Sequence, residues 1–340
     1  MSTKRGFLLM NIGSPDEPST QEIKSFLAEI EKEDLIDLPW PIRALINKSS
    51  THNTNGLRAA YQATWSGSVS PMVRYCTQLV DKLQEKVEDP VVLGMAYGHP
   101  TYKGAIEALL AAHVREICVL PMFAQYALAT VGSCVQRVKS ELKHLHSDAT
   151  LRVVSPFFDH DGYIEAIASS LNLSDEHVLF NYHGYPLRHL KKADHHFEHH
   201  HAHCLSSPDC CATCSMSHAT CYRYQCLATS REIARAAGIR QGNYSTAFQT
   251  HSDQEKWMTP STNQVLHQLP VKGKKKLAVV CPALFCDCLE TLEEIEIRGR
   301  ESFLQAGGES FRTISCLNDS PAAVQCLEQL IANADQWPTA

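Results

Sequence analysis

The feature that most constrains the fold of this chain is an alternation of short apolar runs with longer amphipathic stretches. The runs, most of them rich in β-branched residues, are Phe7–Ile12, Val91–Met95, Ile117–Pro121, Leu151–Val154, His177–Tyr182 and Leu277–Val280. Between most of them, apolar residues recur with a helical period in Gln21–Glu31, Met72–Val87, Lys103–His113, Ser133–Leu145 and Asp161–Leu171. Strands that alternate with helices form parallel sheets joined by right-handed crossovers. The pattern therefore predicts an α/β protein.

The predicted elements divide into two similar sets, and 340 residues are enough for about two domains. We expect one α/β domain over residues 1–150 and a second over residues 151–315. A last amphipathic stretch, Pro321–Asn333, follows the second set, and we expect residues 316–340 to pack back on the first domain. Ligands of open parallel sheets bind beyond the carboxyl ends of the strands. The candidate site therefore lies just after the apolar runs, beside the crevice between the domains.

The charge and the N-terminal sequence argue against some classes of protein. The formal net charge is -6 and the basic residues are scattered, so nucleic acid is not an expected partner. Met1–Arg5 leads directly into an apolar run without the pattern of a signal peptide, which favours a cytoplasmic protein. The longest apolar stretch, Leu277–Cys286, is interrupted by Pro282 and is far shorter than the about 20 residues of a membrane-spanning helix.

A histidine stands at the end of one apolar run. His183 is followed by Gly184 and Pro186, which turn the chain, so we expect its imidazole to face the crevice between the domains. An imidazole in this position can act as a base near neutral pH or bind a metal ion. The alternative is a strand-end histidine that only bonds to the backbone, and the residues alone leave both roles open.

Acidic residues follow the last apolar run. Glu290 and Glu294 are four residues apart and would share one face of a helix, which Arg298 and Glu301 continue. Like charges at this spacing repel each other, but a row of carboxylates beside a crevice can pass a hydrated divalent cation inward and carry protons outward. The alternative is an acidic helix start in solvent, which the helix dipole favours.

Five segments at or near these strand ends form a specific pattern when they are taken together. They are Asn11–Pro15, Gln125–Ser133, Tyr182–Pro186, Ala247–Gln249 with Trp257 beyond it, and Cys281–Ile295. In kind and in order, they resemble the ferrochelatases, lyases that insert ferrous iron into a porphyrin at the end of haem biosynthesis. The resemblance covers nearly the whole chain. It implies two Rossmann-like domains, with parallel sheets flanked by helices and a porphyrin cleft between the domains.

The resemblance also implies roles for single residues. His183 matches the family's active-site histidine, which accepts pyrrole protons or contacts the metal, and Glu290 matches the carboxylate that faces it. Glu294 matches the next member of an acidic path. These roles are coherent, because metal insertion must remove two N–H protons and strip water from the cation. The residues expected to bind the porphyrin are Ile12, Tyr126 and Trp257.

The choice of porphyrin and the activity itself depend on details of the resemblance. Family members that act on coproporphyrin tend to have tyrosine in place of Ile12, so the resemblance implies protoporphyrin IX, with coproporphyrin III as the alternative. Ala124 and Ala127 replace a proline and a serine of the family pattern, and Thr250–Lys256 lacks an arginine and a glycine. Two other functions therefore stay open: a catalytically weakened relative that senses haem or metal, and a chelatase for another metal or tetrapyrrole.

Residues 193–224 form an insert with the cysteines Cys204, Cys210, Cys211, Cys214 and Cys221. Its C-x-x-C pair and flanking cysteines can supply four thiolates, which suit an iron–sulfur cluster or zinc. Some bacterial ferrochelatases carry a [2Fe–2S] cluster on such a segment, so the resemblance implies this cluster, with Zn²⁺ and a loop without metal as alternatives. The expected ligands are Cys204, Cys211, Cys214 and Cys221, with Cys210 as the first substitute. The histidines that can also ligate, or can form a polar surface, are His195, His196, His199, His200, His201 and His203.

The segment Leu35–Ile46 lies where the family has an apolar lip around its cleft. Trp40 stands there beside apolar and basic residues, which suits the surface of a membrane, and this would place the protein at the inner face of the membrane. The alternative is that the segment closes over the porphyrin or packs in the core. We expect a monomer or a homodimer.

Overall fold

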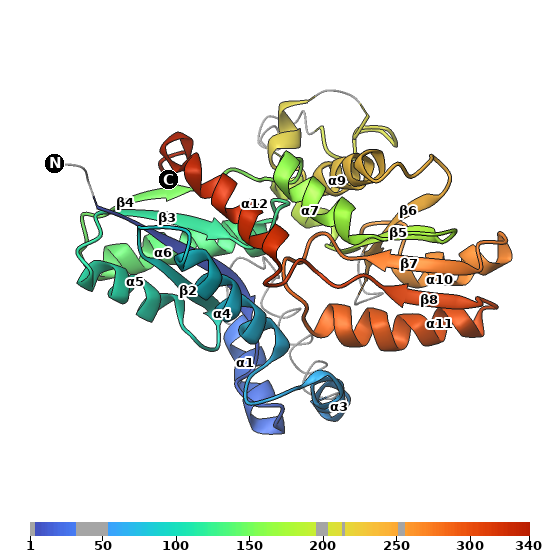
Figure 1. Ribbon diagram of the computed structural model, residues 1–340, viewed down its shortest axis with the longest axis horizontal. Coiled ribbons are helices and arrows are strands. Elements are labelled where there is room, and N and C mark those ends of the chain that lie inside the picture. The colour runs from blue at the N-terminus through green and yellow to red at the C-terminus, as the bar shows by residue number, and fades with distance from the viewer. Residues whose placement is uncertain (1–3, 32–53, 195–202, 213–214, 251–255) are drawn as a thin grey trace.

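Two four-stranded parallel sheets, side by side, form the frame of the protein (Figure 1). The computed structural model describes residues 4–31, 54–194, 203–212, 215–250 and 256–340. The first sheet has the order β2-β1-β3-β4 and consists of β1 (Arg5–Gly13), β2 (Val91–Tyr97), β3 (Glu116–Pro121) and β4 (Thr150–Val153). The second has the order β6-β5-β7-β8 and consists of β5 (His177–His183), β6 (Tyr244–Gln249), β7 (Lys276–Val280) and β8 (Ser310–Thr313). The two sheets thus repeat one topology, and the predicted α/β fold is confirmed.

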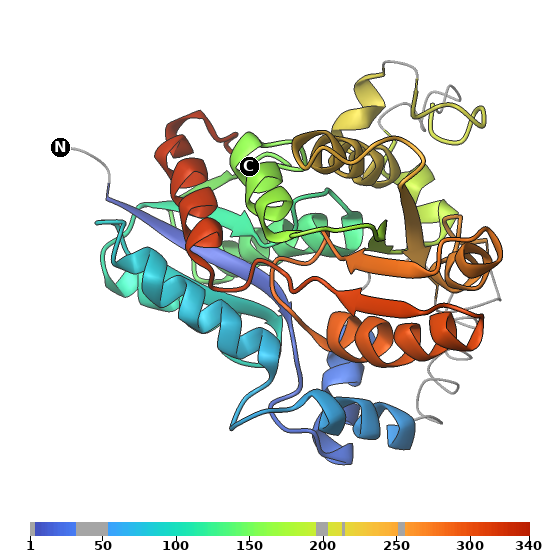
Figure 2. The ribbon, with the colours of Figure 1, turned by 45° about the vertical axis from the view of Figure 1, so that its right-hand side comes forward.

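Helices flank both sheets (Figures 1 and 2). Those of the first half are α1 (Thr20–Glu31), α3 (Thr54–Thr64), α4 (Pro71–Gln84), α5 (Tyr102–Ala111) and α6 (Ser133–His144), with a π-helical turn η2 (Leu128–Gly132) before α6. Those of the second half are α7 (Asp161–Ser170), α8 (Leu187–Lys192), α9 (Tyr222–Ala236), α10 (Thr262–Val271) and α11 (Arg300–Gln305). A π-helix, η5 (Glu290–Gly299), precedes α11, and a 3₁₀ turn, η4 (Met216–Ala219), precedes α9.

Local sequence explains where these elements form. Helix α4 begins because the Ser70 side chain accepts a hydrogen bond from the amide of Val73 and Pro71 occupies the first helical position. Strand β1 is apolar along its length because it lies between two neighbours, and Leu8, Leu9 and Met10 are fully buried in it. The six strands predicted from apolar runs are all present, whereas the edge strands β6 and β8 were not predicted.

The C-terminal segment joins the two halves. Helix α12 (Pro321–Ala332) lies across their junction beside α7 and α4, and a 3₁₀ turn, η6 (Ala334–Gln336), follows it (Figures 1 and 2). The chain then returns to the first sheet, where the ring of Trp337 packs edge-on against Phe7 and Asp335 pairs with Arg5. One apolar cluster contains Phe7 of the first sheet and Phe180 of the second. The halves therefore share a core.

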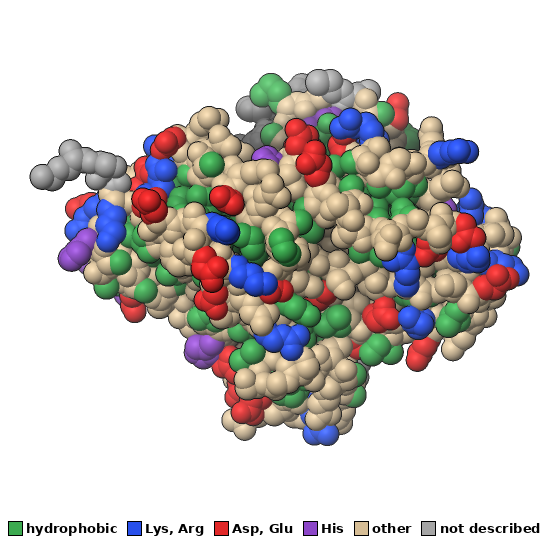
Figure 3. Space-filling view, in the orientation of Figure 1, with side chains coloured by type: hydrophobic (Ala, Val, Ile, Leu, Met, Phe, Trp, Pro, Cys, Tyr) green, Lys and Arg blue, Asp and Glu red, His purple; other side chains and the backbone are tan. Residues whose placement is uncertain are grey.

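On the face shown in Figure 3, basic and acidic side chains are interspersed, and neither positive nor negative charge dominates the surface. Within the described ranges, no helix is both long and apolar enough to cross a membrane. The predicted lip Leu35–Ile46 lies outside the described residues.

Candidate active site between the two sheets

The carboxyl ends of strands from both sheets face one cavity. From the first half, it is lined by Ile12 on β1, Met72 on α4, and Phe123, Gln125 and Thr130 after β3. From the second half, it is lined by His183, Tyr185, Tyr222, Ala283, Leu284 and Glu290. The structure thus brings Ile12, His183 and Glu290, predicted from separate motifs, to the same cavity. This is the position at which open parallel sheets bind ligands.

His183 is held at the end of β5 by its surroundings. Its carbonyl accepts a hydrogen bond of 3.0 Å from the hydroxyl of Tyr222, and its ring meets Tyr185 edge-on with centroids 5.0 Å apart. Gly184 follows where the chain passes close to β6, since a Cβ there would lie 2.0 Å from the carbonyl oxygen of Gln249. Only glycine therefore fits this turn without a shift of the backbone.

The acidic row lies on η5, a π-helix instead of the expected α-helix. Hydrogen bonds in a π-helix run from residue i to i+5, so neighbours on its surface differ from those of an α-helix. Arg298 accordingly binds Glu293, five residues before it, at 2.6 Å, and lies farther from Glu294, at 3.4 Å. Arg298 thus adjoins Glu294, as the spacing suggested, and it also neutralises Glu293, which the spacing did not predict. Glu294 also accepts a hydrogen bond of 2.9 Å from the side-chain amide of Gln249.

The electrostatics of Glu294 differ from those of an exposed carboxylate. Burial raises its pKa to about 7, and the negative charge of Glu290 acts in the same direction, while Arg298 opposes them. A carboxyl group with this pKa exchanges its proton near neutral pH. Glu294 is therefore suited to transfer protons or to bind a cation in exchange for a proton.

Helix α3 packs beside the acidic row, a neighbour that the sequence did not predict. It lies against η5, as Figures 1 and 2 show below the second sheet. Burial and the negative charge of Glu290 are the first two causes that raise the pKa of the Tyr61 hydroxyl, so this tyrosine is near the acidic row and stays protonated. Its ring meets Trp65 edge-on with centroids 6.2 Å apart. The spacing of Tyr61 and Trp65, four residues apart, is the sequence pattern that could have predicted an aromatic helix face here.

Two of the predicted porphyrin-binding residues are not among those that line the cavity. The main-chain amide of Tyr126 donates to Gln225 at 2.7 Å, and the Tyr126 ring packs against the core of the first sheet. Trp257 forms a backbone bridge with Pro186, beside the turn that follows His183. Their roles at the porphyrin stay predictions. Of the altered loop, residues 251–255 lie outside the described residues.

A family model described as Ferrochelatase matches residues 4–335. This chain belongs to the ferrochelatase family. The ferrochelatase of Opitutus terrae is 38% identical to it over 340 residues, which cover 95% of each chain. That of Azotobacter vinelandii is 37% identical and covers 96% of this chain and 98% of its own, and that of Pseudomonas entomophila is 36% identical with 98% and 100% covered.

Solved structures with a similar fold are also chelatases. The chain resembles SirB from Bacillus subtilis with Fe³⁺, with a TM-score of 0.52, 11% identity, and 98% of this chain and 96% of that chain covered. It also resembles the sirohydrochlorin chelatase SirB from Bacillus subtilis subspecies spizizenii in complex with cobalt, with a TM-score of 0.56, 10% identity, and 98% and 97% covered. At these identities, the likeness concerns the fold alone, and it agrees with the predicted two-domain chelatase architecture.

The cysteine insert of this ferrochelatase relative brings three predicted ligands together. The thiol of Cys221 is in hydrogen-bonding contact with those of Cys204 and Cys211, and Cys211 also contacts Cys210. The thiol contact with Cys204 and then burial raise the pKa of Cys221 to about 12. Within the described parts of the chain, no group of three or more His, Cys, Asp or Glu side chains has the geometry of a metal site. The fourth predicted ligand, Cys214, and the histidines between 195 and 201 lie outside those parts.

Hydrogen bonds fold the insert around these thiols. The buried carboxylate of Asp194 accepts from the amide of Cys204 and from the hydroxyl of Ser217, both at 2.7 Å. Contact with the thiol of Cys221 and burial raise the pKa of Cys211 well above its usual range, and the guanidinium of Arg223, 3.5 Å from its sulfur, opposes this shift only in part. These bonds order the segment that carries the three described cysteines of the predicted ligand set.

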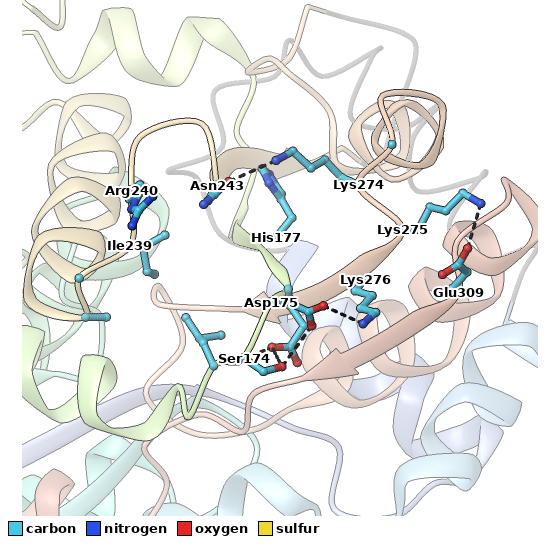
Figure 4. A pocket seen from close by; sticks show the side chains of 15 residues that line it. Ser174, Asp175, His177, Ile239, Arg240, Asn243, Lys274, Lys275, Lys276 and Glu309 are labelled. Carbon is cyan, nitrogen blue, oxygen red and sulfur yellow. Dashed lines mark hydrogen bonds and ion pairs between the residues drawn. The ribbon is translucent and has the colours of Figure 1, made fainter.

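A larger cavity of about 590 Å³ lies away from this site, at the amino-terminal ends of the second sheet (Figure 4). Its charged side chains largely pair with each other, Lys276 with Asp175 at 2.7 Å and Lys275 with Glu309 at 2.9 Å. Because its charges are compensated and parallel sheets bind ligands at the other end, we assign the candidate active site to the smaller cavity at His183.

Proposed function

We propose that this chain inserts ferrous iron into protoporphyrin IX with release of two protons, the last step of haem biosynthesis. The observation that carries the proposal is that His183 and Glu290 line one cavity at the carboxyl ends of the strands, in a chain of the ferrochelatase family. We also propose the domain division at 1–150, 151–315 and 316–340. The sheets and the returning C-terminal segment support this division.

In the proposed reaction, iron and porphyrin are both substrates. The metal must lose water and the macrocycle must lose two N–H protons, so carboxylates and a base must act close together. Glu294, with a pKa of about 7, can release a proton when a cation arrives and pass the cation on to Glu290. His183, at the cavity, can accept a pyrrole proton. Gln249 and Arg298 hold the carboxylate of Glu294 in place.

Porphyrin binding requires the cavity to widen. Its volume here is about 80 Å³, whereas pockets for small organic ligands usually measure about 300–1,000 Å³. Its walls come from both halves of the chain, so the side chains that must move apart belong to both. Ile12 lies in the wall, and an apolar side chain there suits the vinyl groups of protoporphyrin IX better than the propionates of coproporphyrin III.

The test is anaerobic incubation of the purified protein with ferrous iron and either porphyrin, followed through the Soret band. We expect insertion of iron when ferrous iron and a porphyrin are both present, and we expect protoporphyrin IX to be turned over faster than coproporphyrin III. Faster turnover of coproporphyrin III would reverse the substrate assignment. Porphyrin binding without insertion would favour the weakened relative that senses haem or metal, and insertion of another metal alone would favour a different chelatase.

We propose further that the insert holds a [2Fe–2S] cluster through Cys204, Cys211, Cys214 and Cys221. The contacts of the three described thiols support this ligand set. Protein purified without oxygen should then be brown and contain about two irons and two sulfides per chain, and replacement of one ligand by serine should bleach it. A colourless protein with one zinc per chain would show that the insert holds structural zinc instead of a cluster. A protein that contains no metal would show that the insert is a loop without metal.

We propose a cytoplasmic location with contact between Leu35–Ile46 and the inner face of the membrane, and a monomer or homodimer. Co-sedimentation with anionic lipid vesicles tests the contact, with Trp40→Ala as the variant that should weaken it. Equal sedimentation of both proteins would favour the alternative role of this segment, as a cover of the porphyrin. Sedimentation velocity gives the oligomeric state.

A further inference from the structure

The first turn of α9 reaches the catalytic histidine. Tyr222, the first residue of α9, is 5% exposed, and its hydroxyl donates a hydrogen bond of 3.0 Å to the carbonyl of His183. Its ring meets that of Tyr185 edge-on at 4.9 Å between centroids, and Tyr185 in turn meets the ring of His183 at 5.0 Å. Tyr222 thus acts on His183 through a direct hydrogen bond and through a shared aromatic neighbour.

The same helix also contacts the loop after β3, next to the cavity-lining residue Gln125. The side-chain carbonyl of Gln225, one turn along α9 from Cys221, accepts the main-chain amide of Tyr126 at 2.7 Å. The side-chain amide of Gln225 donates to the carbonyls of His218 and Ala219, in the last part of the insert. A displacement of this turn would therefore move the strand end at His183 and the loop at Tyr126 together.

The other end of this connection is the cysteine group. Cys221 is the N-cap residue of α9, directly before Tyr222, and its thiol contacts those of Cys204 and Cys211. Whatever fixes these three sulfurs also fixes the start of α9. The insert has few large apolar residues of its own, so a bound metal would contribute much of its order.

We propose that Tyr222 is a positioning residue for metal insertion, whose hydrogen bond holds His183 at the cavity and transmits the order of the cysteine group to it. The inference rests on the proposed function of the site at His183. It assigns no chemical step to Tyr222, because the bonded atom is the main-chain carbonyl of His183 and the imidazole remains the reacting group.

The test compares Tyr222→Phe with Tyr224→Phe, a matched control in the same turn. Each change removes one hydroxyl and keeps the ring, but Tyr224 stacks on His218 at 3.6 Å and does not line the cavity. For Tyr222→Phe, we expect kcat to fall about fivefold to tenfold, the effect of one neutral hydrogen bond. The KM and the Kd for porphyrin should stay unchanged. Hydrogen exchange in the peptide over Tyr182–Leu187 should become faster, and Tyr224→Phe should change none of these quantities.

A second arm removes the metal of the insert by Cys221→Ser. In the wild-type background, we expect this change to lower kcat and to speed hydrogen exchange over Tyr182–Leu187. In the Tyr222→Phe background, it should add little to either effect, because both changes act through one connection. Additive losses would overturn the role of Tyr222 in this connection. Equal kcat and equal exchange in Tyr222→Phe and Tyr224→Phe would overturn the inference altogether. If the wild-type protein inserts no iron, the proposed function fails, and the exchange measurement still decides whether Tyr222 holds the strand end.

Discussion

The side-chain amide of Gln249 donates a hydrogen bond of 2.9 Å to the carboxylate of Glu294. Gln249 ends β6 and lies in register with His183 at the end of β5, so the histidine and the carboxylate of Glu294 are tied to adjacent positions of one sheet. The π-helix that carries Glu290 and Glu294 is thereby fixed against the strand ends. The site does not depend on a flexible loop to bring its base and its acids together.

The activity should depend on pH through Glu294. Its pKa is raised to about 7 by burial and by the charge of Glu290, so it is largely protonated at pH 6 and largely ionised at pH 8. Because the ionised form binds the cation, kcat/KM for ferrous iron should rise with pH, with a midpoint near 7. Glu294→Gln should remove this rise, and an unchanged profile in that variant would assign the midpoint to another group.

The same group makes a contribution to stability with the opposite dependence. Its pKa in the folded state lies above the ordinary value of 4.5, so folding favours the protonated form. This contribution is complete below the ordinary pKa and is lost as pH rises through about 7. The free energy of unfolding in urea should therefore fall between pH 5 and pH 7 more for wild type than for Glu294→Gln, whereas equal slopes would contradict the raised pKa.

His183→Ala should abolish metal insertion and leave the protein folded. The side chain is half-buried at a strand end and lies outside the apolar core, so we expect a loss of no more than about 1 kcal/mol in the free energy of unfolding. His267→Ala is the control, since His267 is exposed on α10 and its ring bonds only to the carbonyl of Asn263 among the described contacts. Near-normal turnover in His183→Ala would show that another group accepts the pyrrole protons.

The two carboxylates of η5 should differ in their kinetic effects. Glu290 lines the cavity, so Glu290→Gln should lower kcat by about 100-fold or more. Glu294 lies behind it, so Glu294→Gln should mainly raise the KM for ferrous iron. The control is Glu296→Gln on the same helix, where the carboxylate pairs with Arg300 at 3.0 Å on the surface. If all three variants match wild type, the acidic row is only a solvated helix face.

The interior strands and several helices could be predicted because burial and helix capping leave clear patterns in their sequences. Strands buried on both faces, such as β1, are continuous apolar runs, and α4 has both an N-cap serine and a proline at its start. The edge strand β8 was not predicted, because it is only four residues long and three of them, Ser310, Arg312 and Thr313, are polar. It therefore has no apolar run, unlike the edge strands β2 and β4, which were predicted from theirs.

Helix α9 and the geometry of η5 could not be predicted for other reasons. The inner face of α9 buries Gln225, Thr229 and Ser230, so the helix has no plain apolar period. Gln225 and Thr229 bond to loops, and Ser230 bonds to the hydroxyl of Tyr182 on β5. The pairing of Arg298 with Glu293 follows from π-helical geometry, which spacing alone does not distinguish from an α-helix. The motifs predicted His183 and Glu290, but the residues that hold them in place are visible only in the tertiary structure.

Gly184→Ala tests whether the close contact of β5 with β6 positions both sides of the site. The added Cβ would lie 2.0 Å from the carbonyl oxygen of Gln249, so the strand ends must separate. We expect a loss of about 1–3 kcal/mol in the free energy of unfolding, as in other overpacked sites. The folded fraction should also lose activity, because His183 precedes the glycine and Gln249 holds Glu294.

The control for this change is Gly104→Ala in α5, where the added Cβ would meet only the hydroxyl of Thr101, at 3.3 Å. Alanine is favoured over glycine in a helix by about 1 kcal/mol, which offsets that contact, so stability and turnover should stay close to wild type. Urea unfolding and the pH profile of kcat/KM measure both effects. In Gly184→Ala, the midpoint near pH 7 should move, since the bond from Gln249 to Glu294 is displaced. A destabilised protein with the wild-type midpoint and kcat would mean that the contact supports the fold but does not set the geometry of the acids.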